Sequence, residues 1–120
     1  MIEVIEGLPE GVVGLEAVGE VTADDYESVA VPAIERARGD RSKVRLLYVL
    51  GGRFTGYTGG AMWQDAELGI SHPFSWERIA VVTDHDHVRT MVKGLGWLIP
   101  GKVKVFPLSA RSDAESWVTA

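Results

Sequence analysis

Two apolar strands, each running into a polar turn, constrain this fold most. The first predicted strand covers residues 44–50 and enters a Gly-rich segment, 51–60; the second covers 76–83 and enters Asp-His-Asp-His at 84–87. A nearly continuous apolar strand is typical of a parallel sheet covered on both faces. Any site is therefore expected at the carboxyl ends of these two strands.

The rest of the chain supplies further strands. Residues 2–6 and 12–18 read as strands joined by a short Gly-Pro turn, which favours an antiparallel hairpin, and Gly14 is expected to form a bulge. Residues 102–106 alternate Lys and Val, as an edge strand with one wet face should, and lysines there discourage edge-to-edge pairing.

Helices are predicted between the strands. Thr22 is the expected N-cap of the first, Pro32 should kink or split it, and Gly39 suits its end. A second helix is expected from Thr58 or Gly59 to about Gly69. A third begins at Asp84 or Asp86 and presents one apolar face: Val88, Met91, Val92 and Leu95. Ser112 and Glu115 have capping-box spacing for a fourth helix, which carries Trp117 and Val118.

The element order is β-β-α-β-α-β-α-β-α, which predicts an α/β fold with a mixed five-stranded sheet in a single domain, residues 1–120. If all crossovers are right-handed and run one way, every helix falls on one face of the sheet. The other face would then be bare, and this tension leads us to expect that a second copy of the chain covers it, as a homodimer.

Composition excludes several functions. Twelve basic and seventeen acidic residues give a net charge of −5 without a dense basic block, so no nucleic-acid binding is expected. The absence of cysteine excludes disulfides, thiol catalysis and thiolate metal sites. The first six residues lack signal-peptide character, and no apolar run approaches the roughly 20 residues of a membrane span, so we expect a cytoplasmic protein.

The Gly-rich segment at 51–60 allows two interpretations. Five of its ten residues are glycine, and backbone N–H groups leading into a helix can hold an anion. The segment matches neither the phosphate-loop pattern nor the dinucleotide-binding pattern. The alternative is a flexible loop or lid that uses glycine for its backbone conformation.

The run Asp84, His85, Asp86 and His87 looks like a metal cluster, but residues two apart on a helix point in different directions. The plainer interpretation is an Asp N-cap followed by polar residues of the first turn. His85 beside an Asp also suits a general base, yet no nucleophile accompanies it. We therefore expect no metal, no cofactor and no catalytic residue.

Aromatic residues gather near the Gly-rich segment. Phe54, Tyr57 and Trp63 lie within or just after it, while Trp97 follows the third predicted helix. They line a pocket, meet a partner chain or simply fill the core. Arg53, Arg89 and Lys93 are candidates to hold an anionic head group, with ordinary surface charge as the alternative.

Three segments resemble a known family. Residues 43–49, 77–85 and 100–108 are similar to those of the SpoIIAA-like family, small bacterial proteins often labelled STAS domain-containing. The resemblance extends to Thr22–Tyr26 and to Pro32, and so covers essentially the whole chain. It implies the fold of anti-sigma-factor antagonists and a looser likeness to the CRAL-TRIO lipid-carrier fold.

The same resemblance bears on function. It implies no settled activity, but it favours binding of a hydrophobic or amphipathic small molecule. The antagonists are switched by phosphorylation of a serine at the start of the helix after the third strand, but residues 51–60 contain no serine. Thr58 is the hydroxyl nearest that position.

We therefore expect a non-enzymatic protein that binds a small hydrophobic or amphipathic ligand. The alternative is a STAS-type regulatory module with a protein partner and modification at Thr58. The aromatic and Met side chains are expected to form the apolar walls of the pocket. Arg53 and the backbone N–H groups near Thr58 and Asp84 are expected to bind a polar head group. The predicted ligand-binding residues are Arg53, Phe54, Tyr57, Thr58, Met62, Trp63, Asp84 and His85.

Overall fold

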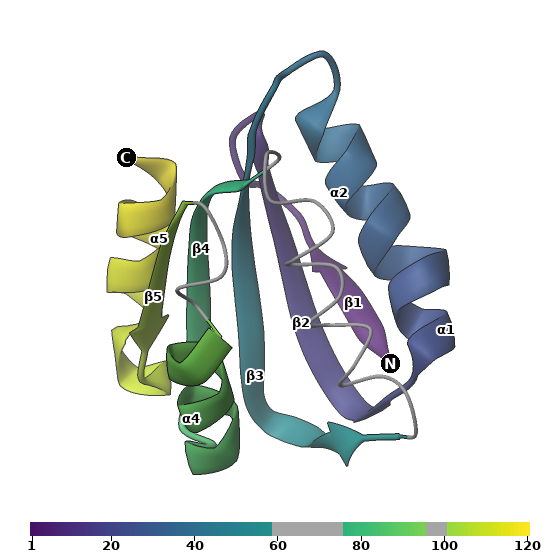
Figure 1. Ribbon diagram of the computed structural model, residues 1–120, viewed down its shortest axis with the longest axis vertical. Helices are drawn as coiled ribbons and strands as arrows, with labels where there is room; N and C mark the ends of the chain where they lie inside the picture. Colours follow the sequence, from purple (N-terminus) through teal and green to yellow (C-terminus); the bar gives the residue numbers. More distant parts are fainter. Residues whose placement is uncertain (59–75, 96–100) are drawn as a thin grey trace.

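A computed structural model describes residues 1–58, 76–95 and 101–120. Within these ranges the chain forms a five-stranded sheet in the order β1-β2-β3-β4-β5, in which β1 is antiparallel to β2 and the others are parallel (Figure 1). The strands are β1 (Ile2–Ile5), β2 (Val12–Val21), β3 (Val44–Tyr57), β4 (Trp76–Thr83) and β5 (Lys102–Phe106). The predicted α/β fold and its hairpin are confirmed.

Helical segments connect and cover the strands. They are α1 (Ala23–Asp25), the π-helix η1 (Tyr26–Ala30), α2 (Val31–Arg38), α4 (Asp86–Leu95), the 3₁₀ turn η4 (Leu108–Ala110) and α5 (Arg111–Thr119). The helix predicted from Thr58 or Gly59 to Gly69 lies outside the described residues. No helix in the described ranges is long and apolar enough to cross a membrane.

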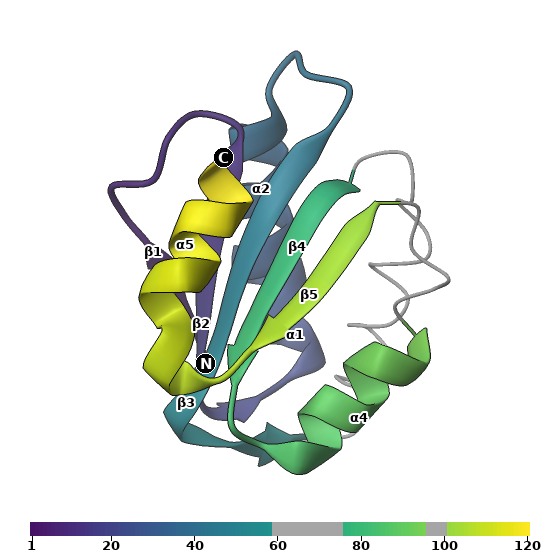
Figure 2. The same cartoon turned by 90° about the vertical axis from the view of Figure 1, so that its left-hand side faces the viewer.

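Helices lie on both faces of the sheet, so the prediction that all fall on one face is wrong. Residues of η1, α2 and α4 pack with one face, around Leu46, Tyr48 and Val81. On the other face α5 covers Leu47, Val49, Ala80, Val82 and Phe106 through Ala114 and Val118. Figure 2 shows α5 and α4 on opposite sides of the strands. Because α5 follows the last strand, no crossover fixes its side, and the reason given for a covering second copy falls away.

The β3 strand is longer than predicted. It continues from Leu50 through the Gly-rich residues to Tyr57, so the expectation of a loop beginning at Gly51 is wrong. The longer β2 provides the partner, with Gly19, Glu20 and Val21 opposite Phe54, Gly56 and Tyr57 after register shifts. A paired neighbouring strand outweighs the weak strand propensity of glycine.

The first helical segment follows its sequence signals. Thr22 caps it, because the Thr22 hydroxyl accepts from the Asp25 N–H at 3.2 Å while the Asp25 carboxylate accepts from the Thr22 N–H at 2.8 Å. Five residues of π-helix then precede Pro32, near the start of α2. Proline lacks an N–H and crowds the preceding turn, and the wider π turn accommodates both effects. The predicted kink or split at Pro32 thus takes the form of a change from π-helix to α-helix, without a gap between the two segments.

Two local predictions are wrong. Gly14 pairs regularly with Ile5 and Leu47 and forms no bulge; a Cβ there would lie 2.8 Å from the Ile5 Cβ, so close packing is what requires glycine. Ser112 caps nothing, because α5 already begins at Arg111 as a continuation of η4, and its N-cap residue, Ala110, makes no side-chain bond.

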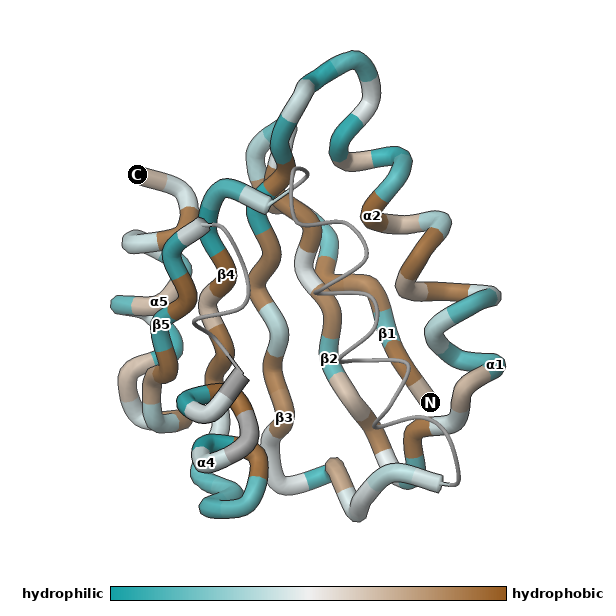
Figure 3. Tube along the Cα trace, in the orientation of Figure 1, coloured by the Kyte–Doolittle hydropathy of each residue, from teal (hydrophilic) through white to brown (hydrophobic). Residues whose placement is uncertain are grey.

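The core follows from this arrangement. Figure 3 shows many apolar residues along β1 to β4, while the helices mix polar and apolar positions. Tyr26 of η1 and Tyr48 of β3 are both buried, and their hydroxyls lie 2.8 Å apart. This hydrogen bond lets two phenols cross an apolar interface between helix and sheet without losing hydrogen bonding.

Candidate functional site

A cluster of rings lies where β3 and β4 end. Phe54 packs edge-on against Tyr57, with ring centroids 5.1 Å apart, and against His85 at 5.3 Å. The ring of His87 lies 5.8 Å from that of His85. Phe54 is buried, whereas Tyr57 and His85 are half-buried. The carboxyl ends of parallel strands thus bring together three of the predicted ligand-binding residues: Phe54, Tyr57 and His85. We call these three residues and His87 the ring cluster.

Hydrogen bonds fix the position of His85. Its backbone N–H donates to the hydroxyl of the buried Thr83 at 3.1 Å, and its ring Nε2 lies 3.2 Å from the Gly51 carbonyl oxygen. A carbonyl can only accept, so this contact places a proton on Nε2. In the neutral ring Nδ1 is then a hydrogen-bond acceptor, on a ring that packs against the buried Phe54.

Thr58 closes the end of β3. Its backbone N–H and its hydroxyl both donate to the Val21 carbonyl oxygen, at 2.9 and 3.3 Å. Tyr57 is the register partner of the same valine. The ends of β2 and β3 are thus tied together directly beside the ring cluster, which limits how far Tyr57 can move.

Asp84 and Arg53 point to other contacts. The Asp84 carboxylate accepts from the Leu108 N–H at 3.0 Å, at the start of η4, while α4 begins two residues later at Asp86. Arg53 forms ion pairs with Glu16 at 3.2 Å and Glu3 at 3.6 Å. Both glutamates share the α5 side of the sheet, opposite the face to which Phe54 contributes. Neither residue is part of the ring cluster.

Met62, Trp63 and Trp97 lie outside the described residues, as do the side chains of Met91 and Leu95. Of the remaining apolar positions on α4, Val88 is buried and Val92 packs partly against the core, as expected. Within the described ranges, no group of three His, Asp or Glu side chains is arranged to hold a metal ion.

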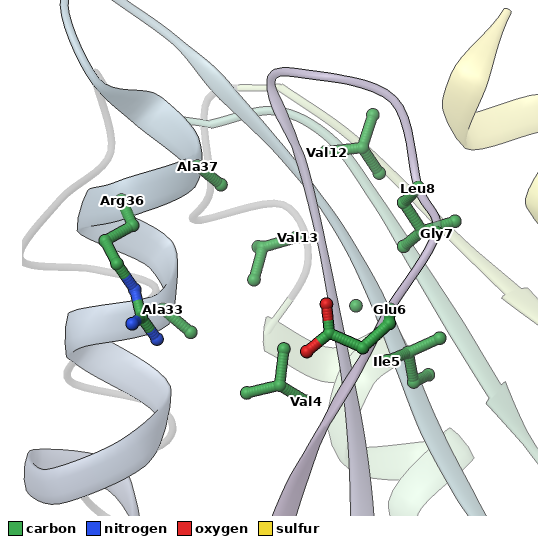
Figure 4. A pocket seen from close by; sticks show the side chains of 11 residues that line it. Val4, Ile5, Glu6, Gly7, Leu8, Val12, Val13, Ala33, Arg36 and Ala37 are labelled. Atoms are coloured by element: carbon green, nitrogen blue, oxygen red, sulfur yellow. The ribbon is translucent and has the colours of Figure 1, made fainter.

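Two hollows were not anticipated from the sequence. One, of about 280 Å³, lies between β1, the following turn and α2, and is lined by apolar side chains together with the charged Glu6 and Arg36 (Figure 4). The other, of about 290 Å³, lies at the amino end of β3 and β4, beside Arg41, Lys43 and Arg45. No motif marks either, because both arise where a turn meets a helix distant in sequence.

At the amino end, two arginines hold the last helix. Arg45 donates to the Val118 and Ala120 carbonyl oxygens and pairs with Glu77, and Arg78 donates to the Trp117 carbonyl oxygen at 2.6 Å. Cations suit the carbonyl end of a helix. The hydrogen bond from Arg45 lowers the pKa of Glu77, and the positive charge of Arg45 acts in the same direction. Sequence reasoning overlooked both arginines.

The fold and the ring cluster define a small α/β module with its candidate site at the strand ends. The model of the SpoIIAA-like family matches residues 12–119, and the chain belongs to this family. The chain is also similar to a crystal structure of an uncharacterized protein of the DUF3478 family, with a SpoIIAA-like fold, from Shewanella loihica PV-4. The identity is 24% over 98% of this chain and 92% of that chain, with a TM-score of 0.72. No curated protein matches.

Proposed function

We propose that the protein is a non-enzymatic cytoplasmic binding module for a small amphipathic molecule, held at the ring cluster. The observation that supports it most is the contact of Phe54, Tyr57 and His85 at the carboxyl ends of β3 and β4. Crevices outside such strand ends are the usual ligand positions in open parallel sheets. The SpoIIAA-like fold is that of a STAS-type module, a class that is generally non-enzymatic.

The chemistry of the cluster suits an amphipathic ligand. The half-buried Tyr57, which packs against the buried Phe54, provides apolar ring surface, and the polar groups are few and fixed in place. Nδ1 of His85 accepts a hydrogen bond when the ring is neutral, because the Gly51 carbonyl holds the proton on Nε2. A hydroxyl or protonated head group donating to Nδ1, with an apolar tail against Tyr57, would use both features.

The test uses 8-anilinonaphthalene-1-sulfonate, an amphipathic fluorescent probe, titrated into the native protein. Tyr57→Ala should weaken binding about tenfold, since it removes an aromatic contact surface, whereas Tyr57→Phe should retain it. Val4→Ala, an exposed apolar position on β1, is the matched control and should bind like the natural chain. Equal binding by all three variants, or no binding at all, would contradict the proposal.

A regulatory module with a protein partner is the second candidate. It is favoured by the position of Thr58, whose half-buried hydroxyl lies just beyond β3, close to where the antagonists carry their phosphorylated serine. Phosphorylation would end the bond to the Val21 carbonyl and place charge beside Tyr57. Intact mass spectrometry of protein from cells should then show a phosphorylated fraction that is lost in Thr58→Val; an unmodified mass under all growth conditions contradicts it.

A further inference from the structure

The two outer strands of the sheet carry opposite charges. β1 contains Glu3 and is followed by Glu6, whereas β5 contains Lys102 and Lys104. Within the described residues neither strand has a neighbour on its outer side. Like charges keep β1 from pairing with another β1, and β5 from pairing with another β5. Neither edge is protected against the other.

The two edges also match in the faces of their side chains. On the α5 face, Glu3 of β1 corresponds to Lys104 of β5, which shares that face with Phe106. On the opposite face, the apolar Ile2 and Val4 correspond to Val103 and Val105, which pack partly against the core of that face. A sheet continued from β5 into β1 would set carboxylate beside ammonium and valine beside valine.

The backbone groups agree with this match. Met1 and Val18 exchange two hydrogen bonds of 2.8 Å, so odd residues of β1 face β2 while Ile2 and Val4 direct their N–H and C=O outward. For an L-residue in a strand, two things determine to which side of the strand its N–H and C=O point. They are the face of the sheet on which its side chain lies and the direction in which the strand runs. Val103 and Val105 lie on the same face as Ile2 and Val4, but β5 runs opposite to β1 and lies at the other edge of the sheet. Their N–H and C=O groups therefore also point outward.

We propose that β1 of one copy adds to β5 of the next as an antiparallel strand, which makes a second copy of this chain the partner of both edges. The register that satisfies both faces places Ile2 opposite Val105, Glu3 opposite Lys104 and Val4 opposite Val103. Beside Val4, the 280 Å³ hollow leaves space for side chains of the added strand (Figure 4). The occupant follows from charge complementarity together with the shared apolar face.

This association is head-to-tail. Each copy uses β1 at one contact and β5 at the other, so the smallest assembly is a dimer with one free edge of each kind, to which further copies add. The mass should therefore rise with protein concentration. Salt should weaken the contact, because the charged pair lies at the surface.

Sedimentation velocity of the full chain over a range of concentrations tests the proposal. Lys104→Glu and Glu3→Lys should each place like charges opposite one another and weaken association about tenfold. The double variant Glu3→Lys/Lys104→Glu should restore it, and so should an equimolar mixture of the two single variants. Arg53 keeps its partner Glu16 in Glu3→Lys, so the fold should hold.

Val4→Pro is an independent variant that removes an outward N–H without removing a β1–β2 hydrogen bond, and it should also reduce association. Circular dichroism of each variant checks that it is folded. A single-chain mass at all concentrations would overturn the proposal. So would an association that the single charge reversals leave unchanged, or that the double variant fails to restore.

Discussion

The two ends of the parallel strands differ in what their side chains contact. At the amino end arginines donate to the end of α5, whereas at the carboxyl end the ring cluster lies beside Thr58, which links β2 and β3. Arg45 and Arg78 direct their guanidinium groups to the α5 carbonyls, and Glu77 completes the contact with Arg45. Phe54, Tyr57 and His85 form the opposite end. At the amino end Arg45 and Arg78 therefore already bind within the fold, whereas at the carboxyl end we propose that the ring of His85 accepts a hydrogen bond from a ligand.

This difference separates stability from binding. A guanidinium group that donates to the carbonyls of a helix end can bind a ligand only if it gives up those hydrogen bonds, which would destabilise the helix. The hollow beside Arg45 is consequently a poorer ligand site than its three basic residues suggest. Substitutions at the two ends should fall into two groups, one that changes mainly unfolding and one that changes mainly ligand binding.

The largest effect on unfolding is expected at Arg45. Arg45→Ala removes the donor to the Val118 and Ala120 carbonyls and the partner of Glu77, and should lower the free energy of unfolding by about 2 kcal/mol. Urea denaturation measures this. Arg41→Ala is the matched control, because its pair with Glu10 is exposed and should contribute under about 1 kcal/mol. Equal losses for the two variants would contradict the special role of Arg45.

A smaller effect is expected at Asp84, which lies at the carboxyl end but serves the fold. Asp84→Ala removes the acceptor of the Leu108 N–H and should lower the free energy of unfolding by about 1 kcal/mol, with Asp84→Asn keeping part of it. Binding of the fluorescent probe should not change. If Asp84→Ala abolished binding in a folded protein, Asp84 would belong to the site after all.

The smallest effect is a dependence on pH at the amino end. The pKa of Glu77 is lowered in the folded protein, first by the hydrogen bond from Arg45. The folded state thus holds the ionised carboxylate more tightly, and this stabilisation is present above the ordinary Glu pKa and is lost as pH falls through the lowered value.

The thermal unfolding temperature of Glu77→Gln should therefore fall less between neutral pH and about pH 3 than that of the natural chain. The same substitution should change that decline much less in an Arg45→Ala background, where only the weaker effects of the Lys43 and Arg78 charges on Glu77 remain. A parallel decline in all chains would exclude this pair as a source of the pH dependence.

Much of the fold could be predicted from the sequence because its signals are local. The apolar run that ends at Thr83 defines β4 at both ends, and Thr22 with Asp25 marks the first helix start. The extension of β3 through Gly51 could not be predicted, because its cause is pairing with a strand about 35 residues earlier. The side taken by α5 was equally inaccessible, since crossover handedness applies only between strands.

For the site, the strand-end rule correctly brought Phe54, Tyr57 and His85 together. It failed to place Arg53, because the sequence predicts a loop at 51–60, and alternation of faces applies only within a strand. In the longer strand the alternation continues: Leu46, Tyr48, Leu50 and Phe54 share one face, and Arg53 lies on the other, where it pairs with Glu16 and Glu3. The contact of Asp84 with Leu108 joins two segments 24 residues apart, for which no spacing motif exists.

The π turn before Pro32 has a consequence for how this chain is compared with its relatives. A π turn holds one residue more than an α turn, so it behaves as a one-residue insertion absorbed within a helix. A relative that lacks both the proline and the π turn would be one residue shorter between Thr22 and Gly39. An alignment of this chain with such a relative should therefore carry a gap inside this helix, where insertions are ordinarily least expected.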